Sequence, residues 1–384
     1  MNLPRRWDIF CAVVDNYGDA GIAWRLAREL AAEHGLSVRL FCDRMHTLAR
    51  IAPDVDPGFD VQSVRGVELR RWDGPSGRDA PAIGAVIVEM FGCGLPEAVL
   101  RAMSENASQP MWINVEYLSA EEWVESTHGL ASRHPRLPLV RYFFFPGFTS
   151  RTGGLLRERD LISTRDAFQR SDDARAALWG RLRLRAPEPG ALTASLFCYA
   201  NRSLSALLGI WADGSQPIFC VVPEGVASPA LEAWNGGSTM QSGRTITRGR
   251  LTLASIPFVA QESYDPLLWA CDINFVRGED SFVRAQWAAR PLIWQTYPQA
   301  EDAHRLKLDA FVARYGRALP PPAANAYGAF SRAWNDAIPM RVAHWRDLME
   351  ARPALGAHAR KWSEELAGLP ELASSLVKFV SDRV

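Results

Sequence analysis

Residues 7–21 read Trp7-Asp-Ile-Phe-Cys-Ala-Val-Val-Asp15-Asn-Tyr-Gly-Asp19-Ala-Gly21, and this stretch decides the fold. Residues 7–14 form a short apolar run that predicts a β-strand, whereas residues 15–21 combine glycine with short polar side chains, as loops do. Residues 22–34 carry apolar side chains at helical spacing, and residues 37–42 begin a second strand. A strand, a helix and a second strand in this order predict a βαβ unit of a parallel sheet.

The same alternation continues along the chain. Further strands are predicted at residues 85–90 and 110–115 and, after a polar stretch rich in arginine at 151–189, at 193–199, 217–222, 251–256, 272–276 and 292–294, with helices at 204–211, 264–270 and 281–289. We therefore predict two Rossmann-like doubly wound α/β domains, 1–182 and 183–361, facing across a cleft. The last helix, within 362–384, is expected to pack back on the first domain. Ligands of such sheets bind at the carboxyl ends of the strands, so functional side chains are expected at those positions.

Composition excludes several classes of protein. The 384 residues include 43 Lys and Arg and 43 Asp and Glu, so there is no positive surplus of the kind that nucleic-acid binding needs. The hydrophobic fraction of 48% is ample for a core and excludes a disordered chain. The sequence contains no run of about 18 apolar residues, so no membrane span is predicted. Together with cysteines set mostly in apolar strands, these features predict a cytoplasmic protein with neither nucleic acid nor membrane as a partner.

Two carboxylates flank the glycine turn after the first predicted strand. Asp15 and Asp19 stand four residues apart and precede a predicted helix, whose N-terminal N–H groups favour negative charge. An alternative role for Asp19 is that of a helix N-cap, since aspartate is among the preferred caps. Because the pair follows the first strand of a parallel sheet, where ligands bind, we expect both carboxylates to be functional.

A second polar cluster, Arg277-Gly-Glu279-Asp280-Ser281, follows the strand predicted at 272–276 and opens a helix. The guanidinium fork of Arg277 matches phosphate oxygens, and the helix N-terminus adds backbone donors. Glu279 and Asp280 would repel free phosphate but can bind sugar or ribose hydroxyls, so the cluster favours a nucleotide sugar as ligand. The alternative is a helix cap made by Ser281 or Asp280 beside a solvated Arg277.

Aromatic and amide side chains mark the ends of two other predicted strands. Phe197 and Tyr199 stand at the end of the strand predicted at 193–199, and Phe258 and Gln261 follow the strand predicted at 251–256. Aromatic rings in such places can stack on a base, although aromatic residues on strands more often belong to the core. Asp54-Val-Asp56 has a form that metal-dependent glycosyltransferases use, but it lies between two prolines in a loop. Since the histidines show no metal-binding spacing either, we expect no metal and no cofactor.

Taken in chain order, these motifs resemble those of the elongation factor P arginine rhamnosyltransferases, the EarP family, over nearly the whole chain. The resemblance is carried by Asp15-Asn-Tyr-Gly-Asp-Ala-Gly21, Asn114-Val-Glu-Tyr-Leu-Ser-Ala-Glu121, Tyr142-Phe-Phe-Phe-Pro-Gly-Phe-Thr149, Thr152-Gly-Gly-Leu-Leu-Arg-Glu158, Ser195-Leu-Phe-Cys-Tyr199 and Arg277-Gly-Glu-Asp-Ser281. Ala20 stands where a larger aliphatic residue is common in the family. The resemblance implies a GT-B fold and an inverting, metal-independent transfer of L-rhamnose from dTDP-β-L-rhamnose to an arginine side chain of elongation factor P.

The resemblance also implies roles for single residues. By position, Asp19 resembles the general base of the family, and Asp15 and Glu279 resemble its other essential carboxylates. The residues that resemble the dTDP-binding set are Phe197, Tyr199, Phe258, Gln261, Arg277, Asp280 and Ser281. Phe258 is expected at the thymine and Asp280 at the ribose. The diphosphate is assigned to the remaining polar side chains, which are Tyr199, Gln261, Arg277 and Ser281.

Two other readings stay open at this point. The chain can be a GT-B transferase that uses a different nucleotide sugar or acceptor, or a non-catalytic nucleotide-binding protein that docks on a translation factor. The paired aspartates favour an enzyme, because a binding module has no need of two carboxylates opposite a diphosphate site. From the residues alone, the prediction extends to a metal-independent nucleotide-sugar enzyme, and the rhamnose and the protein acceptor follow only from the family resemblance.

Overall fold

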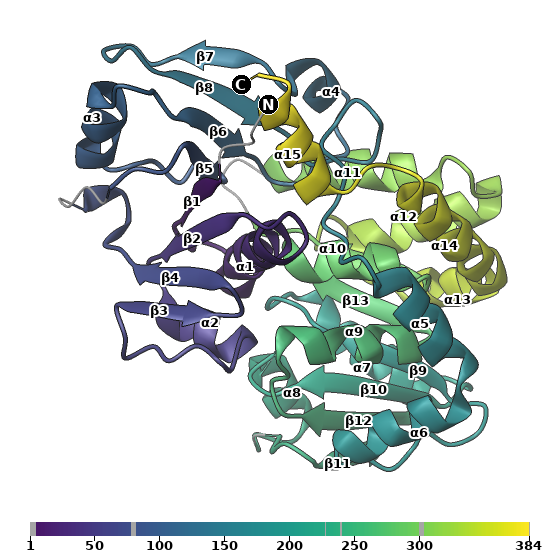
Figure 1. The fold of residues 1–384 in the computed structure, drawn as a ribbon. Helices are drawn as coiled ribbons and strands as arrows, with labels where there is room; N and C mark the ends of the chain where they lie inside the picture. The colour runs from purple at the N-terminus through teal and green to yellow at the C-terminus, as the bar shows by residue number, and fades with distance from the viewer. Residues whose placement is uncertain (1–4, 78–81, 227, 239, 299–302, 384) are drawn as a thin grey trace. The chain divides into compact units, whose positions relative to one another are not determined.

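The computed structural model describes residues 5–77, 82–226, 228–238, 240–298 and 303–383. Its contacts divide the chain into two compact units, Met1–Glu158 with Leu366–Val384 and Arg159–Glu365. Each unit holds one sheet in which parallel strands predominate, as the alternation of strands and helices in the sequence predicts (Figure 1).

Within the described residues, the sheet of the first unit has eight strands in the order β3-β4-β2-β1-β5-β6-β8-β7. The inner strands run parallel and are β4 (Val67–Arg71), β2 (Ser37–Cys42), β1 (Arg6–Cys11), β5 (Val86–Met90), β6 (Met111–Val115) and β8 (Val140–Phe144). The edge strands β3 (Val61–Val64) and β7 (Ala131–Arg133) pair antiparallel. β1 ends before Val13 and Val14, contrary to the prediction, because their N–H groups are bound by carboxylate side chains instead of a neighbouring strand.

The helix after β1 begins earlier than the sequence predicts. α1 (Asn16–Ala32) includes most of the segment predicted as a loop, so that prediction was wrong. Gly18 and Gly21 disfavour a helix, but every residue from 19 to 27 is buried, and this packing outweighs the cost of about 1 kcal/mol that a glycine imposes. As a consequence, Asp15 occupies the N-cap position, and Asp19 lies inside the first turn.

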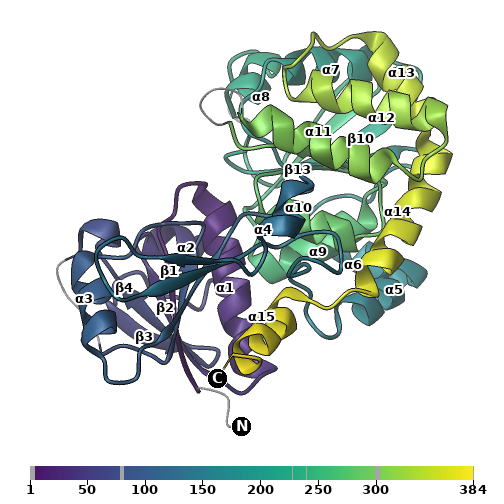
Figure 2. The same ribbon diagram turned by 90° about the horizontal axis from the view of Figure 1, so that it is seen from above.

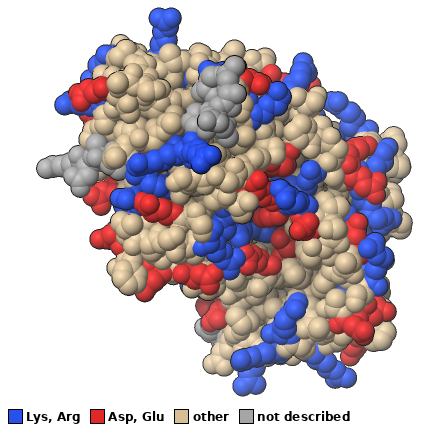
Figure 3. Space-filling model, viewed as in Figure 1, with Lys and Arg blue, Asp and Glu red and all other residues tan. Residues whose placement is uncertain are grey.

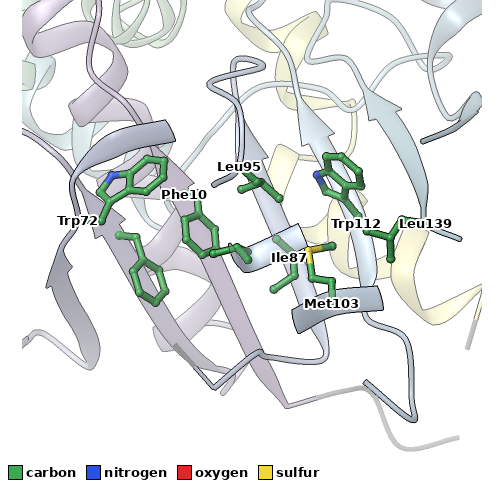
Figure 4. Packing of buried hydrophobic residues seen from close by; sticks show 9 residues of the cluster. Phe10, Trp72, Ile87, Leu95, Met103, Trp112 and Leu139 are labelled. Carbon is green, nitrogen blue, oxygen red and sulfur yellow. The ribbon is translucent and has the colours of Figure 1, made fainter. Parts of the chain in front are cut away.

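A hydrophobic core joins the first sheet to α3 (Glu97–Glu105), as Figure 4 shows. The ring of Phe10 stacks on that of Phe41 with 4.4 Å between their centroids, and Trp72 meets Phe10 edge-on at 5.3 Å. Val99 and Met103 of α3 close the cluster. Because Phe10 and Phe41 are the second-last residues of β1 and β2, this packing fixes the carboxyl ends of both strands, where the loops that hold Asp15 and Asp43 start.

The C-terminal helix α15 (Leu372–Ser381) belongs to the first unit and lies alongside α1 (Figure 2). Its Phe379 packs edge-on against Tyr142 and Phe144 of β8, with 5.6 and 5.4 Å between ring centroids. The chain enters the helix past Gly154, where a Cβ atom would stand 2.0 Å from the carbonyl oxygen of Pro370, so only glycine fits. α15 therefore packs on the same sheet as the chain's first strands.

Within the described residues, the second unit has a six-stranded sheet in the order β11-β12-β10-β9-β13-β14. Its parallel strands are β12 (Leu251–Ile256), β10 (Ile218–Pro223), β9 (Leu192–Leu196), β13 (Ile273–Arg277) and β14 (Leu292–Gln295), and β11 (Thr245–Arg248) pairs antiparallel at one edge. All five strands predicted for this half of the chain are confirmed. β9 ends three residues earlier than predicted, which leaves Phe197 and Tyr199 in the loop that follows it.

Helices flank this second sheet. They are α5 (Leu161–Arg170), α6 (Asp172–Arg181), α7 (Ser203–Asp213), α8 (Ser228–Trp234), α9 (Gln261–Ala270), α10 (Asp280–Trp287), α11 (Ala303–Gly316), α12 (Pro321–Trp334), α13 (Val342–Glu350) and α14 (Arg352–Ala367). α5, which falls in the polar stretch rich in arginine, packs on α9 through Phe168 and Trp269. α11 and α12 lie side by side in both views (Figures 1 and 2). The first unit also contains the short helices α2 (Met45–Ile51) and α4 (Trp123–Thr127).

The charged side chains are spread over the surface. On the face seen in Figure 3, basic and acidic groups are interspersed, in keeping with equal numbers of each in the sequence. Among the described residues, no helix combines the length and the apolar character needed to cross a membrane.

Candidate active site

Asp19 is held at the carboxyl end of β1 by the loop that precedes it. Its Oδ2 atom accepts hydrogen bonds from the backbone N–H groups of Val14 and Asp15, both at 2.8 Å. The residue is fully buried, and Asp15 is 6% exposed. The Oδ1 atom of Asp19 has no partner in hydrogen-bond geometry within the described part of the chain. One oxygen thus anchors the carboxylate, whereas the other is buried without a hydrogen-bond donor among the described residues. A buried acceptor without a donor costs free energy, and such groups often have a functional role.

The surroundings of Asp19 perturb its pKa. Burial raises the pKa, and the backbone hydrogen bonds from Asp15 and Val14 oppose that shift. The Tyr117 hydroxyl is near enough to favour the charged form as well, and the negative charge of Asp43 favours the neutral form. Burial dominates, so the pKa of Asp19 is higher than that of an ordinary aspartate, which makes its carboxylate a stronger base.

Sequence reasoning missed two residues of this group, Asp43 and Tyr117. Asp43 directly follows β2, and its Oδ1 accepts a hydrogen bond of 2.9 Å from the N–H of Val13. Tyr117 follows β6 and stacks on Phe91 with 4.2 Å between ring centroids. The rule that pointed to Asp15, a polar residue directly after a strand, also applies to Asp43 and would have found it.

In the second unit, the segment from Arg277 to Ser281 is a tight turn between β13 and α10. The Ser281 hydroxyl donates to the Arg277 carbonyl at 2.7 Å and accepts from the Arg277 N–H at 3.0 Å. Gly278 has a φ of 56°, in the left-handed region that favours glycine, and its carbonyl accepts a hydrogen bond from the Trp294 indole. Glu279 is buried at the N-cap position of α10. The turn therefore presents the first N–H groups of α10 at the carboxyl end of β13.

Arg277 is held between aromatic rings. The carbon of its guanidinium lies 4.3 Å from the ring centroid of Phe197 and 4.6 Å from that of Tyr199. Nη1 donates to the carbonyl oxygen of Cys198 at 2.9 Å. These contacts fix the plane of the guanidinium at the edge of the sheet, as recognition of a planar or tetrahedral oxyanion requires.

The aromatic residues of the predicted set differ in exposure. Phe197 is buried and packs against Tyr264, with 5.7 Å between ring centroids. Phe258, in the loop after β12, is half-buried and lies 6.5 Å from Phe197. Phe258 is therefore the more exposed of the two rings, whereas Phe197 serves the core and supports Arg277.

Two further residues of the predicted set contact each other. The Gln261 side-chain amide donates to Oδ2 of Asp280 at 2.9 Å, which ties the start of α9 to the start of α10. Asp280 also accepts from Arg284, which in turn donates to Asp265, and the sequence singled out neither of these two residues. Their signal was present in the sequence as a spacing of four residues, from Gln261 to Asp265 and from Asp280 to Arg284, which places each pair on one helical face.

Tyr199 directly precedes Ala200, which lines a cavity of about 320 Å³ at the carboxyl ends of β9 and β14. The N–H of Tyr199 donates to the side-chain oxygen of Gln295 at 2.8 Å, a buried residue that sequence reasoning missed. The lining of the cavity includes Ala200, Arg202, Gln295, Thr296, His304 and Asn335. The structure thus places all seven residues predicted to bind dTDP at or just after the carboxyl ends of strands of one sheet.

The two groups offer complementary chemistry. The first has a buried carboxylate of raised pKa, which can accept a proton, and the second has a fixed guanidinium and helix N–H groups, which can hold a diphosphate. Within the described ranges, no group of three or more His, Cys, Asp and Glu side chains is arranged to bind a metal ion.

Comparison with known proteins identifies the family. The sequence profile described as Elongation-Factor P (EF-P) rhamnosyltransferase EarP matches residues 7–381. A protein-arginine rhamnosyltransferase of Pseudomonas putida is 47% identical over 373 residues, covering 97% of this chain and 98% of its own. A solved structure concerned with EarP-mediated arginine glycosylation of translation elongation factor EF-P is similar with a TM-score of 0.70 and 36% identity, over 99% of both chains.

A more distant structure confirms the fold. MurG of Acinetobacter baumannii matches with a TM-score of 0.50 and 11% identity, over 98% of this chain and 99% of that one. At this identity the likeness bears on the fold alone, and it agrees with the predicted GT-B fold. With the family profile spanning nearly the whole sequence, the chain belongs to the EarP family of protein-arginine rhamnosyltransferases.

Proposed function

We propose that this enzyme transfers L-rhamnose from dTDP-β-L-rhamnose to one arginine of elongation factor P, without a metal and with inversion at the anomeric carbon. The observation that carries the proposal is the state of Asp19, a buried carboxylate with one anchored oxygen and one oxygen that lacks a hydrogen-bond partner among the described residues. A guanidinium presents several N–H donors and would satisfy that oxygen. The family relationship supports the sugar and the arginine acceptor.

The acceptor needs a carboxylate for a chemical reason. A guanidinium stays protonated, with a pKa above about 12, and its delocalised lone pairs make it a weak nucleophile in water. Hydrogen bonds to Asp19 would orient one nitrogen toward the anomeric carbon. As the C–N bond forms and the bond between C1 and the diphosphate oxygen breaks, the attacking nitrogen becomes acidic and its proton passes to Asp19. Attack from the side opposite the leaving group inverts the anomeric centre.

The leaving diphosphate needs positive charge. Arg277, held by Phe197, Tyr199 and the carbonyl of Cys198, would supply a fixed cation to its oxygens. The N–H groups that begin α10 add oriented donors. In this structure the Ser281 hydroxyl donates its hydrogen to the Arg277 carbonyl, so its support of the diphosphate would come chiefly from shaping the turn.

A mass measurement tests the proposed reaction. The purified chain is incubated with dTDP-rhamnose and elongation factor P, and the intact mass of the factor is followed with time. The expected result is the addition of one deoxyhexose, located by fragmentation on an arginine, at a rate unchanged by EDTA. An unmodified factor, or a rate abolished by EDTA and restored by a divalent cation, would contradict the proposal.

The raised pKa of Asp19 predicts a pH dependence. The base must be ionised, so kcat/KM for the acceptor is expected to fall with decreasing pH through the pKa of Asp19, which lies above that of an ordinary aspartate. Asp43→Asn removes a negative charge that raises this pKa and keeps an oxygen to accept from Val13. The acidic limb of the profile should therefore move to lower pH in the variant. A limb that stays in place or moves to higher pH would argue against the assignment.

Phe258→Ala is expected to weaken dTDP binding by about 1–3 kcal/mol if the half-buried ring stacks on the base. Calorimetric titration with dTDP measures this directly. Titration with inorganic pyrophosphate is the control, because it lacks the base and should bind both forms equally. An unchanged affinity for dTDP would return Phe258 to a role in the core.

A further inference from the structure

Arg284 lies at the centre of a buried cluster of charges in the second unit. It projects from α10 one turn after Asp280, and its side chain is 2% exposed. Nε donates to Oδ2 of Asp280 at 3.0 Å, and Nη1 donates to Oδ2 of Asp265 at 2.6 Å. Asp265 belongs to α9, so the guanidinium connects the two helices whose first turns carry Gln261 and Asp280.

The same oxygen of Asp280 receives a second donor. The side-chain amide of Gln261, which stands one turn before Asp265 on α9, donates to Oδ2 of Asp280 at 2.9 Å. Two donors that converge on one carboxylate oxygen fix the rotation of the carboxyl group and hence the direction of its other oxygen. Arginine suits this position because its planar fork binds two carboxylates at once, whereas a lysine is a single point of charge.

We propose that Arg284, held in place by Asp265, is a positioning residue for the nucleotide of the donor and acts through Asp280 and Gln261. The inference rests on the proposed function, because it takes these two residues as part of the dTDP site. Arg284 itself is too deeply buried to touch a ligand in solvent. Its contribution is to orient the carboxylate of Asp280 in advance, so that binding loses no free energy in ordering it.

A purely structural ion pair would behave differently. Breaking a buried pair destabilises a fold wherever the pair lies, but only a positioning residue changes the affinity for the donor selectively. Because the ground state and the transition state use the same nucleotide contacts, the predicted defect is a raised KM for the donor with kcat and the acceptor KM unchanged.

The first test compares two buried arginines of the same unit. Arg284→Lys is expected to raise the KM for dTDP-rhamnose about tenfold, the effect of losing one hydrogen bond to a charged group, with kcat nearly unchanged. Arg165→Lys is the matched control. Arg165 is 5% exposed and donates to the carbonyl of Trp287 and the hydroxyl of Ser363, away from the predicted dTDP set. The Arg165→Lys variant should have a lower unfolding temperature and an unchanged KM for dTDP-rhamnose. Equal donor KM values for the two variants would overturn the inference.

The second test asks whether Arg284 acts through Asp280. Calorimetric titration with dTDP is carried out on the intact chain, on Asp280→Ala, on Arg284→Lys and on the double variant, with circular dichroism to show that each is folded. Arg284→Lys should weaken binding in the parent chain and cause no further loss once Asp280 is removed. If Arg284→Lys weakened dTDP binding equally with and without Asp280, or did not weaken it in the parent chain, the inference would be overturned and the proposed function would stand. Failure of the unaltered chain to bind dTDP would instead overturn the proposed function, and the inference with it.

Discussion

Replacing Asp19 by asparagine is expected to slow rhamnosyl transfer by about 10²–10⁴-fold, the range that a positioned general base contributes. The amide cannot receive the proton that leaves the attacking nitrogen, although its oxygen can still accept the N–H groups of Val14 and Asp15. The rate of mass increase of elongation factor P under single-turnover conditions measures the loss. Near-normal turnover of Asp19→Asn would remove Asp19 from the role of base.

The same variant should keep its fold and its affinity for dTDP. Folding raises the pKa of Asp19, so the stabilisation linked to this group is present below its unfolded pKa and is lost as the pH rises through its folded pKa. At neutral pH the ionised carboxylate therefore costs stability, and a neutral amide should leave the unfolding temperature unchanged or higher. Asp43→Asn is the matched control, since it removes a charge from the same sheet edge and should retain turnover at neutral pH. A lower unfolding temperature for Asp19→Asn would mean that lost activity reflects a damaged fold.

Replacing Arg277 by methionine is expected to weaken binding of dTDP-rhamnose about tenfold to hundredfold, the loss of one or two hydrogen bonds to a charged group. The value of kcat should fall as well, because the charge on the leaving diphosphate grows in the transition state. Methionine keeps much of the packing volume beside Phe197 and Tyr199, so the change in affinity is due mainly to the lost charge and not to lost packing. Titration with the donor measures the loss of affinity, and turnover at saturating donor measures the fall in kcat.

A matched control for Arg277→Met is available in the same unit. Arg248 of β11 also lies over an aromatic ring, with its guanidinium carbon 4.8 Å from the centroid of Trp234, but it belongs to the edge strand. Arg248→Met should leave donor binding and turnover unchanged. If Arg248→Met and Arg277→Met had the same effect, the role of Arg277 would be that of a general surface charge and not of a diphosphate ligand.

The sequence predicted the strands that are continuous apolar runs, the edge strand β14 among them, and missed the partly exposed inner strands β4 and β8 and the antiparallel edge strands β3, β7 and β11. Strands such as β5 and β10 are buried throughout and appear as continuous apolar runs between turns, which is a strong local signal. β7 and β11 are short and mostly exposed, so they carry no apolar pattern and are defined by the backbone of a neighbouring strand. The start of α1 was misplaced for the related reason that its glycines are helical only because the surrounding residues are buried.

The candidate site was predictable where one residue directly follows one strand. Asp15 and Arg277 were found by that rule, because the topology of a parallel sheet brings such positions together. The anchoring of Asp19 by the N–H groups before its own helix was not foreseen, since it depends on where the helix begins. Arg284 was missed because its spacing from Asp280 indicates only a shared helical face, and its contact with Asp265 of another helix is specified by no local pattern.

The most direct test of the account is a crystal structure of the chain with dTDP bound. The account predicts the diphosphate beside Arg277 and the first N–H groups of α10, the ribose at Asp280, and the thymine against Phe258. A nucleotide bound elsewhere, with the turn from Arg277 to Ser281 empty, would contradict it.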